Sequence, residues 1–287
     1  MRFSNVLCTK QVATNGRDGG GISDSFFSDW KIRPALIAAR DLIPDNLSAL
    51  IENCGLVIVR GVDEPVVDGI VALAGLRSMM QYELVQSNQT DPFVLRTVAK
   101  SGDSGITPAS KPKSTLVHQD GYQFPARYCG FVIAGNLHMP DVEILHYPVV
   151  REKRLIFVHG VPAAVKATAR IGADLIGALK QPLFSVDIDE YKRLDPLLNE
   201  PEPFPVIYAD ELGWRCQIGG RVYSNNADAQ FAIDVFRRYL ESEDVYSFQV
   251  EPGDLAFFNQ RLVAHAGLRP TRDGETVLVR RLMRWQR

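Results

Sequence analysis

Two residues near the middle of the sequence, His118 and Asp120, are separated by one position in the stretch STLVHQDGY (114–122). In a strand, alternate side chains point to the same face, so the imidazole and the carboxylate would lie side by side while Gln119 points away. Such a pair could be two metal ligands, two members of a catalytic relay, or an ordinary surface pair. The pair alone does not decide between these three readings.

A second histidine, His265, lies 147 residues later (265 − 118) in the stretch EPGDLAFFNQRLVAHAG (251–267). This stretch predicts a turn that uses the permissive backbone of Gly253, then a buried strand, then a histidine among small residues that let another group approach it. Two histidines and one carboxylate on one face, with other positions open, form the facial triad that holds Fe(II) in non-haem oxygenases. We therefore expect His118, Asp120 and His265 to be metal ligands and the catalytic centre.

The last predicted strand, TVLVRRLMRW (276–285), carries arginines that suit an organic acid. A bidentate keto acid on the metal needs its distal carboxylate held, and the planar guanidinium matches a carboxylate best. Alternation places Arg280 and Arg284 on one face, which we expect to point inward. Arg281 is the rival candidate, although it falls on the other, mostly apolar face with Val277, Val279, Met283 and Trp285.

These three stretches together resemble the Fe(II)/2-oxoglutarate-dependent dioxygenases, and within them the taurine dioxygenase and clavaminate synthase-like group. The run GLVIVRGV (55–62) also resembles the first core strand of that group. The resemblance covers most of the chain from about residue 40, but the part that has the quality of a motif is short. It implies a mainly β fold with flanking helices, built on a double-stranded β-helix, or jelly-roll, core.

The resemblance also implies cofactors and residue roles. Fe(II) would bind to His118, Asp120 and His265, with 2-oxoglutarate and O2 as cosubstrates. Arg280 matches the arginine that anchors 2-oxoglutarate, and Arg284 matches a position that often faces an acidic group of the substrate. Many relatives carry a further threonine that contacts 2-oxoglutarate, but VEILHYPVV (142–150) and RLIFVHG (154–160) have none, so the second anchor is unassigned.

The residues that flank the first motif are candidates for substrate contact. Tyr122 could line the pocket, although an aromatic residue there is as often part of the core. Thr115 precedes the motif and could contact the substrate. His138, His146 and His159 are expected to be structural or exposed, and a second metal site is not expected.

The implied reaction is hydroxylation of an unactivated C–H bond in a small polar molecule, such as an amino acid or an intermediate of secondary metabolism, with release of succinate and CO2. Desaturation, cyclisation or rearrangement by the same chemistry is an alternative. Halogenation is not expected, because Asp120 occupies the position that a halide would need. Two other classes stay open: a jelly-roll protein that binds 2-oxoglutarate without turnover, and a cupin-type metal enzyme that does not use it.

The composition limits the partners. The chain has 287 residues, of which 46% are hydrophobic and 23% charged, as in soluble globular proteins. A net charge of −2 argues against nucleic acid as a partner. The four cysteines show no C-x-x-C spacing, which suits a reducing cytosol, and the absence of a signal-peptide pattern or a long apolar run predicts a cytoplasmic protein without membrane contact. The oligomeric state is left open, with a homodimer as one option.

We expect one domain over residues 1–287. It would comprise an irregular N-terminal arm (1–30), a helical decoration (about 40–90) and a jelly-roll core (about 92–287) with inserted lid segments. Four helical segments are predicted. They are 43–55, capped by Asp45 or Asn46 and ended by Gly55; 64–80; 161–179, as one continuous helix; and 226–242, capped near Asn226 and with Ala229, Ile233, Phe236 and Leu240 on one face.

Overall fold

The computed structural model describes eleven segments of the chain, which are residues 35–78, 94–100, 117–119, 141–150, 154–171, 174–187, 202–210, 213–219, 222–242, 246–268 and 275–285.

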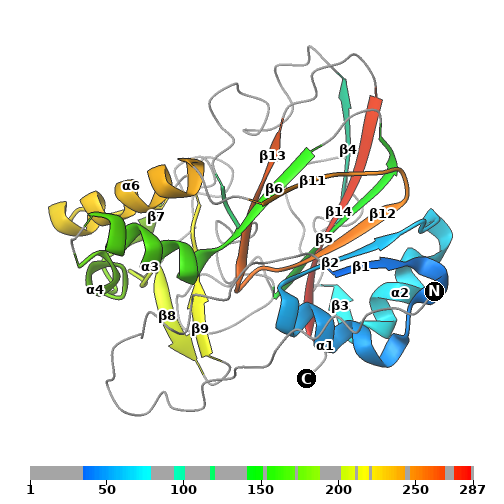
Figure 1. Cartoon of the computed structure of the whole chain (residues 1–287), viewed down its shortest axis with the longest axis horizontal. Helices are drawn as coiled ribbons and strands as arrows, with labels where there is room; N and C mark the ends of the chain where they lie inside the picture. Colours follow the sequence, from blue (N-terminus) through cyan, green and yellow to red (C-terminus); the bar gives the residue numbers. More distant parts are fainter. Residues whose placement is uncertain are drawn as a thin grey trace.

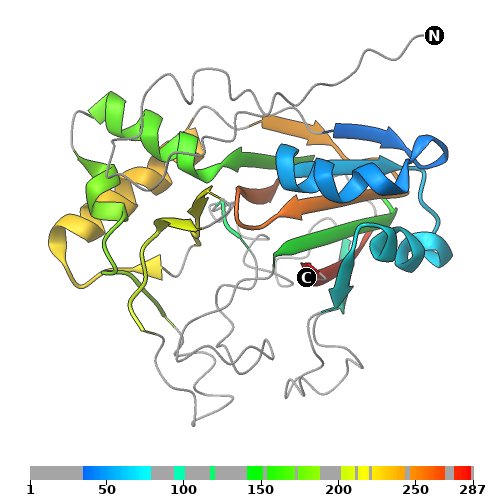
Figure 2. The same cartoon turned by 90° about the horizontal axis from the view of Figure 1, so that it is seen from below.

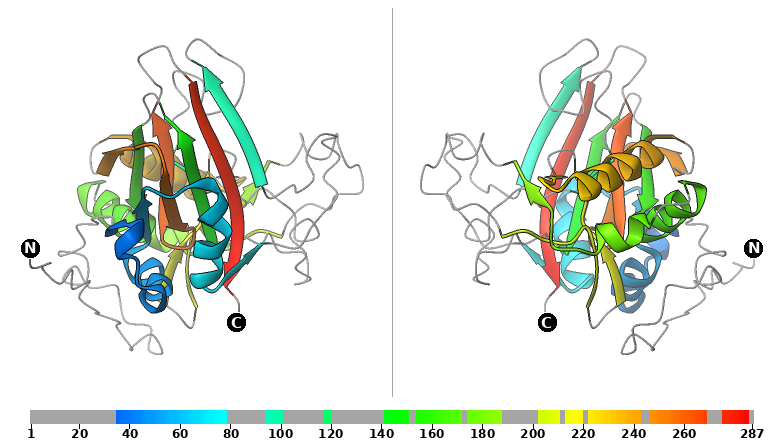
Figure 3. Two further views of the ribbon diagram at one scale, coloured as in Figure 1. Left: turned by 90° about the vertical axis from the view of Figure 1, so that its right-hand side faces the viewer. Right: turned by 90° about the vertical axis from the view of Figure 1, so that its left-hand side faces the viewer.

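The largest element is a seven-stranded sheet with the order β1-β2-β12-β5-β14-β3, in which β4 also pairs with β14. The strands β1 and β2 are parallel, and the other pairs in this sheet are antiparallel. Figure 3 shows the long strand β14 beside β4. The strand bounds are β1 Ala35–Ala38, β2 Leu56–Arg60, β3 Leu76–Ser78, β4 Val94–Lys100, β5 Val142–Val149, β12 Asp254–Asn259 and β14 Glu275–Trp285.

A second, three-stranded antiparallel sheet has the order β11-β6-β13. Its strands are β6 Arg154–His159, β11 Tyr246–Gln249 and β13 Val263–Leu268. Two short pairs complete the described strands: β7 Ser185–Val186 with β10 Val222–Tyr223, and β8 Ile207–Asp210 with β9 Gly213–Cys216.

The helices lie in two groups at opposite ends of the molecule (Figures 1 and 2). One group consists of η2 Ala39–Asp41, α1 Pro44–Cys54, η3 Glu64–Val66 and α2 Val67–Leu73. The other consists of α3 Gly160–Ile171, α4 Leu175–Leu179 and α6 Ala227–Ser242. Among the described residues, no helix has the length and apolar character needed to cross a membrane.

Three buried apolar clusters show how these parts form layers. The first joins α1 and α2 to one face of the seven-stranded sheet, through residues such as Leu47, Val57 and Phe257. The second contains Leu145, Phe258 and Val263, and so joins the opposite face of that sheet to β13. The third joins β13 to the other helices, through Ala264, Ala266, Ala164, Ile233 and Phe236. Strand β13 therefore turns Val263 toward the large sheet and its two alanines toward the helices.

Several sequence predictions are confirmed. The helix α1 ends at Gly55, whose φ of 74° is in the left-handed region that glycine favours. The apolar runs of β2 and β12 are buried strands. The helix α6 buries the predicted face, and Asn226 caps it, because its Oδ1 accepts hydrogen bonds from the backbone N–H groups of Asp228 and Ala229.

Four predictions about the helical parts need correction. The cap assigned to Asp45 or Asn46 is wrong: Ile43 occupies the N-cap and Pro44 starts the helix, as its fixed φ favours. The continuous helix over 161–179 is wrong too, since Asp174 starts a new helix by accepting a hydrogen bond from the N–H of Gly177 at 2.7 Å. The segment from about residue 40 is more than a helical decoration, because it supplies β2 and β3 to the large sheet. The helical spacing expected over 64–80 is likewise wrong in part: α2 ends at Leu73, and Leu76–Ser78 form the strand β3.

Candidate metal centre

The structure places His118 and His265 directly opposite each other. His118 donates its backbone N–H to the carbonyl of His265 at 2.9 Å, and His265 donates its own to the carbonyl of His118 at 2.7 Å. The two ring centroids are 4.9 Å apart. Paired residues in an antiparallel ladder share a face, so both imidazoles lie on the same side. The 147-residue separation in sequence therefore closes to a direct contact, as the triad prediction requires.

The imidazole of His265 is held between the two sheets. It is buried, and its ring centroid lies 4.8 Å from that of Phe258 on β12. Its Nε2 atom lies 3.4 Å from Oε2 of Glu143 on β5. Since Val263, the next same-face residue along β13, belongs to the cluster between the sheets, the strand geometry itself directs His265 to this place.

Gln119, between the two motif residues, is fully buried and fixes the backbone of this segment. Its Nε2 donates to the carbonyl of Cys216 at 2.9 Å and to the carbonyl of Gln260. Its Oε1 accepts from the N–H of Ile218 at 2.8 Å, and its own N–H donates to the carbonyl of Ile218 at 3.0 Å. Alternation along the strand predicts that the side chain of Gln119 points away from the side chain of His118. The hydrogen bonds of Gln119 connect the His118 segment to the segments that contain Cys216, Ile218 and Gln260.

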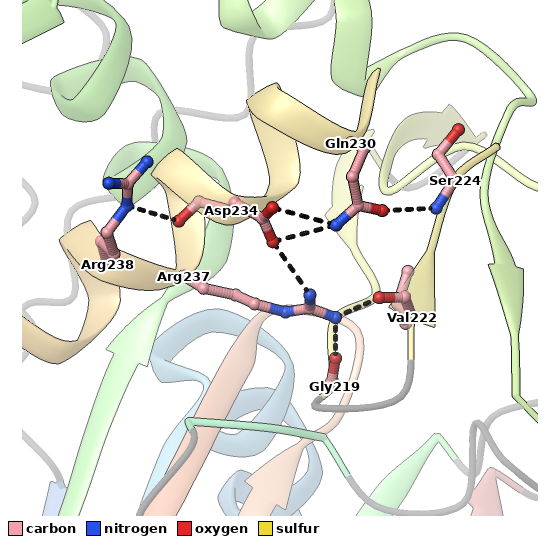
Figure 4. Close-up of polar contacts among 7 residues, drawn as sticks. All are labelled: Gly219, Val222, Ser224, Gln230, Asp234, Arg237 and Arg238. Atoms are coloured by element: carbon pink, nitrogen blue, oxygen red, sulfur yellow. Dashed lines mark hydrogen bonds and ion pairs between the residues drawn. The ribbon is translucent and has the colours of Figure 1, made fainter. Parts of the chain in front are cut away.

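The chain behind Gln119 is in turn anchored to the helix α6. The guanidinium of Arg237 donates to the carbonyl of Gly219 at 2.8 Å and to the carbonyl of Val222 (Figure 4). Gln230 accepts from the N–H of Ser224 at 2.8 Å and donates to Asp234. These contacts fix the segment that includes Ile218, and through Gln119 they stabilise the position of His118.

The final strand separates its arginines by face. Arg281 lies with Val279 and Met283 on the face that packs against the N-terminal helices, and its Nη2 is 3.3 Å from Oδ1 of Asp68 on α2. Arg280 is partly buried, and it pairs in register with Leu145, a member of the cluster between the sheets. The structure thus gives Arg281 an ion pair on the outer face and places Arg280 on the face toward β13.

Several predicted site residues lie outside the residues that the structure describes. These are Asp120, Tyr122 and Thr115, and for Arg284 only the backbone is described. Of the histidines expected to be structural or exposed, His138 also lies outside the described residues, and only the backbone of His159 is described. Among the described residues, no group of three or more histidine, cysteine, aspartate or glutamate side chains could hold a metal. The remaining histidine, His146, is fully buried with its Nε2 3.1 Å from the carbonyl of Val62, which confirms a structural role.

The sequence analysis missed Glu143 and Gln260. Both are fully buried, and Nε2 of Gln260 donates a hydrogen bond to Oε2 of Glu143. The carboxylate affects its surroundings: burial raises the pKa of Tyr147 well above its ordinary value, and the charges of Glu143 and Asp254 raise it further. The available signal was an acid inside the apolar run VEIL, at the same-face spacing as Leu145 and Tyr147.

The donor set suits a divalent metal. Two imidazoles lie side by side and supply two of the ligands, while the carboxylate of Glu143 lies behind one of them as a neighbour and not as a ligand. Imidazole and carboxylate ligands bind Fe(II) and related first-row ions. The described residues therefore fit a metal site that a third ligand beside His118 would complete.

The chain resembles known proteins in its three-dimensional structure, whereas comparison of its sequence with known families finds no match. No known family profile and no curated protein matches the chain. Asparagine oxygenase, in its complex with Fe(II), 2S,3S-3-hydroxyasparagine and succinate, matches 85% of this chain and 75% of its own, with a TM-score of 0.54 at 16% identity.

The non-haem iron oxygenase OrfP matches in several structures, among them the two complexes that follow. With Fe and alpha-ketoglutaric acid it covers 85% of this chain and 80% of its own, with a TM-score of 0.56 at 15% identity. With Fe, succinate and (3S)-hydroxy-L-Arg it covers 83% and 78%, with a TM-score of 0.55 at 14% identity. The chain therefore has the fold of the non-haem iron oxygenases asparagine oxygenase and OrfP, which confirms at the level of the fold the resemblance to the taurine dioxygenase and clavaminate synthase-like group.

Proposed function

We propose that the chain is an Fe(II)- and 2-oxoglutarate-dependent oxygenase that hydroxylates an unactivated C–H bond of a small polar substrate. The observation that carries this proposal is the reciprocal backbone pairing of His118 with His265, which brings their rings to 4.9 Å within a fold shared with iron oxygenases. The substrate class is an amino acid or a related natural-product intermediate. The complexes of asparagine oxygenase with hydroxyasparagine and of OrfP with hydroxy-arginine support this choice.

His118, Asp120 and His265 would hold Fe(II) in a facial triad. Bound iron, with 2-oxoglutarate and O2 as cosubstrates, would supply the oxidant for the C–H bond, and the 2-oxoglutarate consumed would be released as succinate and CO2. In this proposal the two sheets form the two halves of a jelly-roll within one domain.

The chain's own residues bind and orient. Arg280 would hold the distal carboxylate of 2-oxoglutarate, because it is partly buried and on the face of β14 that looks toward β13. Arg284 would pair with an acidic group of the substrate, and Tyr122 and Thr115 would contact it. The apolar side chains around His265, among them Phe258 and Val263, would exclude water from the centre.

An anaerobic titration tests this proposal. Metal-free protein is mixed with Fe(II) and then with 2-oxoglutarate, and the weak visible charge-transfer band of the complex is followed. The variants are His265→Ala, Arg280→Ala and Arg281→Ala. Arg281 is a matched control, since it is an arginine on the same strand whose side chain pairs with Asp68 on the opposite face.

We expect a band in the wild type and in Arg281→Ala, and no band in His265→Ala. Arg280→Ala should need about 10–100-fold more 2-oxoglutarate, because a charge-assisted hydrogen-bonded pair contributes about 1.5–3 kcal/mol. Bound iron without a band in the wild type would rule out the 2-oxoglutarate chemistry and favour the cupin-type reading. A band without succinate formation for any amino acid tested would favour a binding protein that does not turn over.

A further inference from the structure

A line of buried polar side chains connects the two histidines by a second route besides their backbone pairing. Glu143 lies against His265, with 3.4 Å between Oε2 and Nε2. Gln260 donates its side-chain N–H to Oε2 of Glu143. The backbone carbonyl of Gln260 accepts from Nε2 of Gln119, which is the neighbour of His118. Glu143, Gln260 and Gln119 are all fully buried.

The position of Glu143 is costly and therefore informative. It lies on β5 at the same-face spacing as Leu145 and Tyr147, both buried in the cluster between the sheets. A carboxylate taken out of water destabilises the fold unless polar partners compensate. Its Oε2 atom has two such partners, the amide of Gln260 and the imidazole of His265. An apolar residue at this position would avoid the free-energy cost of removing a carboxylate from water. The presence of Glu143 therefore suggests that the carboxylate has a role in the site.

We propose that Glu143 is a positioning residue for His265, and that Gln260 and Gln119 couple this contact to the His118 segment so that the two histidines are held as one unit. The inference rests on the proposed function, since it assumes that His265 binds metal. A carboxylate against a ligating imidazole fixes the orientation of the ring and raises its basicity as a ligand. The ring of Phe258, at 4.8 Å, restricts the imidazole of His265 further.

Gln260 has a particular place in this arrangement, because it uses its side chain and its backbone for different partners. The side chain reaches Glu143, and the backbone carbonyl reaches Gln119. Its own N–H donates to the carbonyl of Asp141 at 3.0 Å, just before β5. The turn between β12 and β13 is thereby tied both to the strand that carries Glu143 and to the segment that carries His118.

The test measures the affinity of metal-free protein for Co(II), an air-stable probe that imidazole and carboxylate ligands also bind. A chromophoric chelator competes for the ion, and the visible spectrum of bound Co(II) reports its coordination. The variants are Glu143→Gln and Gln260→Met. Asp254→Asn is the matched control, because Asp254 is another buried carboxylate, on β12, whose contacts are with Arg60 and Glu251 and not with a histidine. Thermal unfolding of each metal-free variant shows whether it is folded.

We expect Glu143→Gln to bind Co(II) about 10–100-fold more weakly, as is typical when such an outer partner of a metal ligand is lost. Gln260→Met, which keeps the carboxylate but removes its amide partner, should weaken binding by a smaller factor and shift the Co(II) spectrum. Asp254→Asn should bind as the wild type does. If Glu143→Gln does not fold, Gln260→Met carries the test alone.

Wild-type affinity in folded Glu143→Gln, or in Gln260→Met where it alone carries the test, would overturn the inference while leaving the metal site in place. An equal loss in Asp254→Asn would also overturn it, because the effect would then come from buried charge in general. Failure of the wild type to bind Co(II), or full binding by His265→Ala, would instead remove the proposed function and this inference with it.

Discussion

Replacing Gln119 by leucine is expected to lower the free energy of unfolding by more than the loss of a single surface hydrogen bond would, because Gln119 is fully buried. Leucine is close to glutamine in size, so the change leaves the packing volume nearly unchanged and removes the amide. The amide serves three backbone groups: the carbonyls of Cys216 and Gln260 and the N–H of Ile218. All three belong to segments that pack behind His118.

The magnitude follows from these contacts. The N–H of Ile218 loses its buried acceptor, which costs about 1–3 kcal/mol, and each of the two lost donor contacts costs about 0.5–1.5 kcal/mol. The sum is about 2–6 kcal/mol. Gln217→Leu is the matched control: its side-chain amide donates a hydrogen bond to the carbonyl of Pro205 at 2.9 Å, and it is only partly buried. Its loss should cost about 0.5–1.5 kcal/mol.

Urea unfolding of the metal-free proteins measures both effects without any contribution from the metal. With a slope near 3 kcal/mol per M, the midpoint of Gln119→Leu should fall by about 0.7–2 M, and that of Gln217→Leu by less than about 0.5 M. Equal midpoint shifts in the two variants, at equal slopes, would refute the reasoning, because the buried bridge would then contribute no more than one peripheral hydrogen bond.

Two further predictions concern the surroundings of the site. A Cβ atom on Gly160 would lie 2.5 Å from Sγ and 2.6 Å from Cβ of Cys216, so Gly160→Ala should lower the unfolding free energy by about 1–3 kcal/mol. Adding Cys216→Gly, which removes both atoms, should recover part of this loss, and thermal unfolding of both single variants and the double variant shows whether the effects are coupled. Burial raises the pKa of Asp254 above its ordinary 3.8, against the lowering effects of a backbone hydrogen bond at Glu251 and of Arg60. The folded protein therefore binds this proton more tightly than the unfolded chain does. Stability should fall as the pH rises from the ordinary pKa of the carboxyl to its raised pKa in the folded protein. Asp254→Asn removes this dependence, so its melting temperature relative to wild type should improve from about pH 4 to about pH 7, and a constant difference would contradict the assignment.

The parts of the fold that the sequence predicts well are those in which one face or both faces are apolar. The central runs of β2 (Leu56–Val59) and β12 (Leu255–Phe258) are apolar because both faces of these strands are covered, one by the N-terminal helices and the other by the second sheet. Alternation in β14 correctly separated Arg281 from Arg280, since Val277, Val279 and Met283 are buried on the Arg281 side. The helix α6 follows from its 3.6-residue period and from Asn226.

What the sequence could not supply are contacts that depend on distant backbone atoms. The partners of Gln119 are main-chain groups 97 to 141 residues away, and nothing in STLVHQDGY indicates them. For Glu143, the sequence shows only that an acidic residue interrupts an apolar run. Its hydrogen-bond partner, Gln260, lies in a turn more than 100 residues later. The break between α3 and α4 was visible in principle, because Asp174 stands three residues before Gly177, but the apolar period continues across it.

The pairing of His118 with His265 also has a consequence for how the protein is made. A ribosome adds about 5–20 residues per second, so the second histidine follows the first by about 7–30 s. During that interval the strand partner of His118 does not exist, and neither does β12, which forms the middle of the large sheet. A nascent chain that has not yet reached His265 therefore lacks the histidine pair on which the proposed metal centre depends, and metal loading under that proposal would follow synthesis of β13.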